Sequence, residues 1–127
     1  MADVNRGNRP LSPHTTIYRW PLNAIMSILH RITGVGMSVS AMLIVWWFLA
    51  ASTSQSYFAT ANGFLTSWFG DIILFLSMLA IWYHFTNGIR HLIWDTGSNF
   101  GKRRVYRSGI TGLAIAVILS AITVYIA

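Results

Sequence analysis

Hydrophobic residues are concentrated in three long runs that contain no Lys, Arg, Asp or Glu, and polar stretches separate these runs. The runs extend over Ile32–Ala51, Ile72–Ile89 and Ser108–Ala127. Because a helix needs about 20 mainly apolar residues to cross a bilayer, each run is long enough to form a transmembrane helix. The pattern therefore predicts an all-α integral membrane protein with three transmembrane helices.

The helices and their connections account for the whole chain. We expect one membrane-anchor domain over residues 1–127 that begins with a polar segment over 1–24 and leaves no room for a soluble catalytic domain. The connection over 52–70 is rich in Ser, Thr, Ala and Phe, so it fits either a surface loop or a short helix lying on the membrane. The three helices are expected over about 25–51, 71–94 and 107–127.

The composition supports a membrane location and excludes several kinds of site. Charged residues make up only 9% of the chain, against roughly a quarter in an ordinary soluble domain. Cysteine is absent, which excludes disulfides, iron–sulfur clusters and thiolate metal sites on this chain. The net charge is +6. Because the basic residues lie beside apolar spans, they favour contact with anionic head groups over nucleic acid binding.

Basic residues are distributed unevenly among the polar segments. The 52–70 connection has none, whereas the segment before and into the first span and the connection after the second span are basic. The positive-inside rule therefore places the N-terminus and the second connection in the cytoplasm. The polar start does not resemble a signal or transit peptide, so a bacterial inner membrane is favoured over the mitochondrial inner membrane. The basic residues are Arg6, Arg9, Arg19, Arg31, Arg90, Lys102, Arg103, Arg104 and Arg107.

One ionisable residue lies deep inside the second span. His84 comes thirteen residues after Asp71, which is roughly 20 Å of helix and places it past the membrane midplane. Helical periodicity puts His84, Gly88, His91 and Asp95 on nearly one face, descending toward the predicted cytoplasmic side. Because ionisable groups are costly inside a membrane, this face is a candidate functional site.

The chemistry of this face fits three functions. A neutral imidazole deep in lipid suits a haem ligand, with Gly88 leaving space for the macrocycle and His91 and Arg90 placed to meet its propionates. A proton relay is the second possibility. The third is a structural histidine that bonds to a neighbouring helix.

A second set of polar residues lies at the start of the first span. Ser27, His30 and Arg31 share a helix face because they are three and four residues apart. They lie toward the same side of the membrane as the His84 face, which permits one shared site. A hydroxyl, an imidazole and a guanidinium can bond a small carbonyl ligand and stabilise negative charge on it. The alternative is that Arg31 only reaches the head groups.

Two motifs resemble the cytochrome b membrane-anchor subunits of succinate dehydrogenase, which is respiratory complex II. The first is R-P-L-S-P-H-T-T-I-Y at Arg9–Tyr18, followed by S-I-L-H-R-I-T-G at Ser27–Gly34. The second is H-F-T-N-G-I-R-H-L-I-W-D at His84–Asp95. Both occur in the family's order and at its helix positions, and the resemblance covers essentially the full chain.

The resemblance implies roles for individual residues. His84 matches the family's axial haem b ligand, and Ser27 and Arg31 match its ubiquinone-site residues. His30 and Arg31 fall where the family places partners of the haem propionates, and His91 and Asp95 are weaker candidates for the same polar network.

The resemblance also implies partners. Since His14, His30 and His91 are expected near the cytoplasmic surface, the second haem ligand should come from another chain, the smaller hydrophobic anchor subunit. A flavoprotein carrying FAD and an iron–sulfur subunit would dock on the cytoplasmic face and supply electrons from succinate. The chain would then be one subunit of succinate:ubiquinone oxidoreductase that has no catalytic activity on its own.

Two other functions are consistent with the sequence. A fumarate reductase anchor would run the same chemistry in reverse, although a single deep histidine disfavours the two-haem members of that class. A membrane scaffold or small transporter component would bind no haem at all.

Overall fold

The computed structural model describes residues 17–126, which form four α-helices and no strand. The predicted all-α class with three transmembrane helices is confirmed, because α1, α3 and α4 are each long and apolar enough to cross a membrane. Arg6, Arg9, His14 and Ala127 lie outside the described residues. The helices are α1 (Leu22–Thr53), α2 (Gln55–Leu65), α3 (Trp68–Asp95) and α4 (Lys102–Ile126).

All three long helices begin earlier than the hydrophobic pattern indicates, and α3 starts at Trp68 rather than near residue 71. α1 starts at Leu22 rather than near residue 25, directly after Pro21, whose carbonyl accepts the backbone N–H of Ala24 at 3.0 Å. α4 starts at Lys102 rather than near residue 107. Lys and Arg are good helix formers, so a basic run can extend a helix beyond its apolar part.

The sequence left open whether the 52–70 connection is a surface loop or a short helix. In the structure it contains the short helix α2. Ser54 begins it, and the Ser54 hydroxyl accepts the backbone N–H of Tyr57. Two indoles at the end of α1 bond to α2: Trp46 donates to the Tyr57 hydroxyl at 2.8 Å, and Trp47 donates to the Asn62 amide oxygen at 3.2 Å. These bonds hold α2 against α1.

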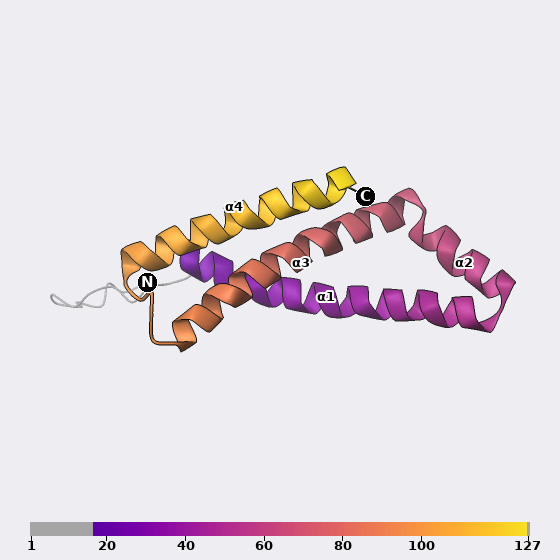
Figure 1. Cartoon of the computed structure of the whole chain (residues 1–127), viewed down its shortest axis with the longest axis horizontal. Coiled ribbons are helices and arrows are strands. Elements are labelled where there is room, and N and C mark those ends of the chain that lie inside the picture. The colour runs from indigo at the N-terminus through magenta and orange to yellow at the C-terminus, as the bar shows by residue number, and fades with distance from the viewer. Residues whose placement is uncertain (1–16, 127) are drawn as a thin grey trace, which may run out of the picture.

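The three long helices form an uneven bundle with α3 at its centre. α3 packs against both α1 and α4, whereas α1 and α4 have a smaller contact. α1 and α3 cross near one end of the bundle and diverge toward α2, which spans the gap between their far ends (Figure 1). The start of α1 and the α3–α4 connection lie at the same end (Figure 1), so the basic residues near both are gathered there.

Few side chains are buried, and the buried apolar cluster lies at the end where α1 and α3 cross. Met26, Tyr83 and Ala116 bring α1, α3 and α4 together, and the Tyr83 hydroxyl donates to the Met26 carbonyl at 2.8 Å. Most large apolar side chains on the long helices are exposed. In a membrane such surface is covered by lipid or by another helix, so its exposure is expected.

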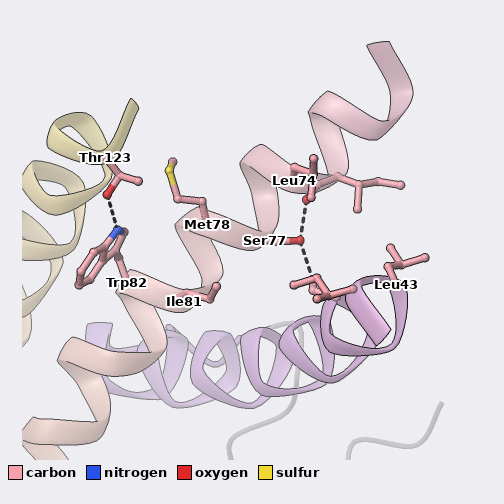
Figure 2. A pocket seen from close by; sticks show the side chains of 10 residues that line it. Leu43, Leu74, Ser77, Met78, Ile81, Trp82 and Thr123 are labelled. Carbon is pink, nitrogen blue, oxygen red and sulfur yellow. Dashed lines mark hydrogen bonds between the residues drawn. The ribbon is translucent and has the colours of Figure 1, made fainter. Parts of the chain in front are cut away.

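Away from this cluster, the helices are linked by isolated polar bonds beside an apolar groove of about 310 Å³ (Figure 2). The Ser40 and Ser77 hydroxyls are 2.6 Å apart and connect α1 to α3. The Trp82 indole donates to the Thr123 hydroxyl at 2.9 Å and connects α3 to α4 (Figure 2). The four polar side chains that line this groove, Ser40, Ser77, Trp82 and Thr123, are thus bonded within the protein.

Candidate functional site

The crossing of α1 and α3 brings three histidines together. The His30 ring of α1 stacks on the His84 ring of α3, with centroids 3.9 Å apart and planes 17° apart. His91, two helical turns along α3, lies on the other side with its centroid 5.2 Å from that of His30. The two polar faces predicted from the sequence therefore meet in this histidine cluster, with His30 between the two α3 histidines.

The ring of His84 is held in one orientation by its Nδ1 atom. Nδ1 lies 3.1 Å from the His30 carbonyl oxygen and 3.2 Å from the Thr33 hydroxyl. A carbonyl oxygen only accepts, so Nδ1 carries the hydrogen and donates. The Thr33 hydroxyl donates in turn to the carbonyl of Leu29 or His30, each at 2.9 Å, and its oxygen remains available to accept from Nδ1.

This arrangement leaves the second ring nitrogen of His84 with a lone pair. Since Nδ1 is protonated in the neutral ring, Nε2 is the unprotonated atom. Among the described residues no side chain or backbone group forms a hydrogen bond with Nε2. An imidazole whose Nδ1–H is bonded to a backbone carbonyl and whose Nε2 is unengaged has the arrangement of a metal-ligating histidine.

Two glycines border the histidine cluster, and they differ in the space around them. A Cβ atom at Gly34 would lie 3.1 Å from His84 Cε1, which is tighter than ordinary contact. A Cβ atom at Gly88 would meet nothing within 4 Å. Gly34 therefore makes room for the His84 ring itself, whereas Gly88 borders open space beside α3.

The cluster continues toward the end of α3 through aromatic contacts. The Trp94 ring meets the His91 ring edge to face at 4.9 Å between centroids. The guanidinium carbon of Arg90 lies 4.2 Å from the centroid of the Trp94 ring, in a cation–π contact. His30 Nδ1 and Trp94 Nε1 are buried without a hydrogen-bond partner among the described residues.

Ser27 and Arg31 flank His30 on the face of α1 predicted from the sequence. Ser27 is half-buried and Arg31 is exposed. Neither side chain forms a hydrogen bond within residues 17–126, so the hydroxyl and the guanidinium keep their donors for other groups. His30 has ring contacts with the histidines of α3, whereas Ser27 and Arg31 form no hydrogen bond with them.

One expectation about this region was wrong. Arg90 was placed to meet the haem propionates, but it is 6% exposed and its guanidinium is bonded inside the helix bundle. His30, which was expected near the cytoplasmic surface, stacks on the ring of the deeper His84, because α1 begins before its apolar run and His30 is already two turns inside the helix. Asp95 is exposed and forms no hydrogen bond within the described residues, so its place in the polar network stays a prediction.

Sequence reasoning also missed residues that shape the site. Thr33 follows His30 by three positions, so helical spacing could have placed it beside the histidine face. Trp94 follows His91 by three positions in the same way. Asn87 is buried at 2% exposure, and an amide inside an apolar span was a detectable signal of a polar contact between helices.

The histidine cluster does not form a metal site from protein ligands alone. Within the described part of the chain no three His, Asp or Glu side chains are placed to hold an ion. The rings of His30 and His84 are stacked face to face, whereas two ligands of one metal point their nitrogens at a common centre. A metal bound by one imidazole of this cluster would need its other ligands from outside the described residues.

The chain is similar to known proteins over nearly its full length. A family model described as "Succinate dehydrogenase/Fumarate reductase transmembrane subunit" matches residues 5–123. A succinate dehydrogenase cytochrome b556 subunit of Paracoccus denitrificans is 48% identical over 126 residues, which cover 99% of this chain and 97% of the relative. The cytochrome b556 subunit of Rickettsia bellii is 38% identical, with 86% and 82% covered. The mitochondrial cytochrome b560 subunit of Homo sapiens is 36% identical, with 89% and 68% covered.

Proposed function

This chain belongs to the family of succinate dehydrogenase and fumarate reductase transmembrane subunits, and from that premise we propose that it is the membrane-anchoring cytochrome b subunit of a succinate:ubiquinone oxidoreductase. In this role it helps to bind haem b, contributes to the site where ubiquinone is reduced, and holds the soluble subunits at the membrane. The observation that carries the proposal is the His84 ring, whose Nδ1–H is fixed by the His30 carbonyl and whose Nε2 is unengaged.

The residues around His84 fit haem b. His84 Nε2 would be the axial ligand, and Gly34 lets the ring sit close to α1. The porphyrin itself supplies the equatorial ligands that this chain lacks. When bound, haem b supplies a centre that takes up and releases one electron at a time. His30, Arg31 and His91 are the groups of this chain assigned to its propionates, and the partnerless His30 Nδ1 is consistent with that assignment.

The second axial ligand is assigned to the smaller anchor subunit. The His30 ring is stacked on the His84 ring with centroids 3.9 Å apart, and the His91 ring is tilted against His30 at 5.2 Å. Both residues are assigned to the propionates, so another histidine that would hold the iron is expected from the partner subunit.

Ser27 and Arg31 are assigned to ubiquinone. The Ser27 hydroxyl and the Arg31 guanidinium would donate hydrogen bonds to one carbonyl oxygen of the quinone. As electrons arrive, negative charge develops on that oxygen, and a guanidinium stabilises it more strongly than the neutral quinone. Both side chains have donors that are not used within the described residues, which supports a role toward a ligand.

The electrons come from partner subunits. This chain has no cysteine, so the iron–sulfur clusters belong to the iron–sulfur subunit, and FAD belongs to the flavoprotein. Both would dock at the basic end of the bundle, which the positive-inside rule assigns to the cytoplasm. We place the protein in a bacterial inner membrane as a multi-pass subunit, since relatives from Paracoccus and Rickettsia match 99% and 86% of the chain.

The test of this proposal is a reduced-minus-oxidised absorption spectrum of membranes that contain the chain with its partner subunits. We expect a b-type haem band that appears when succinate is added, because succinate is the electron donor of the complex. Membranes with the partners but without this chain are the control. A spectrum without a b-type band would instead favour a scaffold that binds no haem.

The close contact at Gly34 gives a finer test of the His84 assignment. Gly34→Ala adds a methyl group 3.1 Å from His84 Cε1, so the ring must shift, and we expect the haem absorption band to move or broaden. Gly36→Ala is the matched control because its Cβ would meet nothing within 4 Å and both changes raise helix propensity equally. Identical spectra for the two variants would argue against haem ligation by His84.

A further inference from the structure

Arg90 occupies an unusual position for an arginine in an apolar bundle. It lies on α3 and is only 6% exposed. Its guanidinium bonds to groups on all three long helices: Asn23 on α1 at 3.1 Å, Asn87 on α3 at 3.1 Å, and the Val105 carbonyl on α4 at 2.9 Å. Its Nε–H also donates to the Ser108 hydroxyl on α4 at 3.1 Å.

These contacts use every donor that the guanidinium has. Nε–H donates to Ser108, one N–H of NH2 to Asn23 and the other to Val105. The remaining two, on NH1, point to Asn87 and, at 4.0 Å, to the Met26 sulfur. All acceptors are neutral, and no carboxylate contacts Arg90 within residues 17–126. A guanidinium whose donors are all used has none left for a ligand. Its role is therefore to link the helices to which it is bonded.

On the α1 side, Arg90 is bonded to the helix that carries Ser27, His30 and Arg31. Asn23 lies one turn before Ser27 and two turns before His30 and Arg31. Apart from the contacts of Arg90 with Asn23 and Met26, the bond from the Tyr83 hydroxyl to the Met26 carbonyl is the only one between α1 and α3 at this end that the described residues form outside the histidine cluster. On the α4 side, Ser108 and Val105 belong to a helix without any candidate site residue.

We propose that Arg90 is a positioning residue which, through its bond to Asn23, holds α1 in register with α3 so that Ser27, His30 and Arg31 lie correctly beside His84 and His91. The inference rests on the proposed function of that α1 face. The planar fork of arginine is the feature that matters, because it reaches α1 and α4 at once with separate nitrogens. A lysine ammonium keeps the charge but presents its donors from a single point.

Asn23 and Ser108 allow a matched test of this role. Each accepts one bond from the guanidinium at 3.1 Å, but Asn23 belongs to the helix with the site residues and Ser108 does not. In the assembled complex we expect Asn23→Ala to raise the KM for a short-chain ubiquinone by about tenfold, with kcat little changed, and to shift the haem absorption band. Ser108→Ala should leave the KM within about twofold and the band in place. Arg90→Lys should reproduce the effects of Asn23→Ala.

Succinate oxidation with a soluble dye is the assembly control and should be unchanged in all three variants. If Asn23→Ala fails to assemble, Asn23→Ser, whose shorter side chain withdraws the acceptor from Arg90, is measured in its place. Equal effects of the Asn23 and Ser108 variants, or wild-type values for Arg90→Lys, would overturn the positioning role. The proposed function fails separately, if changes at Ser27 and Arg31 themselves leave ubiquinone reduction intact.

Discussion

Replacing His84 with leucine is expected to remove the b-type haem band from the purified complex, or to reduce it to a small and spectrally altered fraction. Leucine has a similar size but no nitrogen, so the iron would lose the ligand that this chain is proposed to supply. The helices should still insert, because the change makes the centre of α3 more apolar. The measurement is the ratio of haem to protein in the purified complex, together with the shape of the reduced-minus-oxidised band.

His91→Leu is the control for this experiment. It removes an imidazole on the same helix and in the same cluster, with its centroid 5.2 Å from that of His30. Unlike His84, however, His91 is assigned to the propionates and not to the iron. We expect the complex to retain haem with a changed band position. If His84→Leu and His91→Leu gave the same haem content, His84 would have no special role as a ligand. An unaltered spectrum in His84→Leu would exclude the assignment.

The features that could be predicted from the sequence are those that depend on one helix at a time. The three spans follow from runs of about 20 apolar residues, whatever the neighbouring helices do. The common face of Ser27, His30 and Arg31 follows from the rotation of about 100° per residue. The depth of His84 within α3 follows from the rise per residue. None of these depends on how the helices are packed.

The features that could not be predicted depend on the rotation and crossing of one helix relative to another. The stacking of His30 on His84 requires α1 and α3 to cross at one particular register, and sequence spacing within each helix does not set that register. Arg90 was expected to meet the haem propionates for the same reason. Its acceptors are two amides, a hydroxyl and a backbone carbonyl, and neutral partners of this kind leave no pattern of opposite charges in the sequence.

Arg31→Ala is expected to lower the rate of ubiquinone reduction by a factor on the order of 100, since it removes the charged donor assigned to the quinone oxygen. Ser27→Ala should have a smaller effect of about tenfold, because it removes a neutral donor that is half-buried on the same face. Both variants should oxidise succinate with an artificial soluble acceptor at nearly the wild-type rate. That reaction takes electrons from the soluble subunits and does not need the quinone site.

The comparison between the two acceptors separates ligand binding from assembly. Arg104→Ala is the control for charge: it removes a basic residue that is exposed at the same end of the bundle but lies on α4, away from the α1 face. It should leave both rates unchanged. Arg31→Lys keeps the charge and loses the fork, so an intermediate rate would indicate that both charge and geometry are used. An equal loss with both acceptors would mean that Ser27 and Arg31 serve assembly of the complex rather than ubiquinone, because only a damaged attachment of the soluble subunits slows both reactions alike.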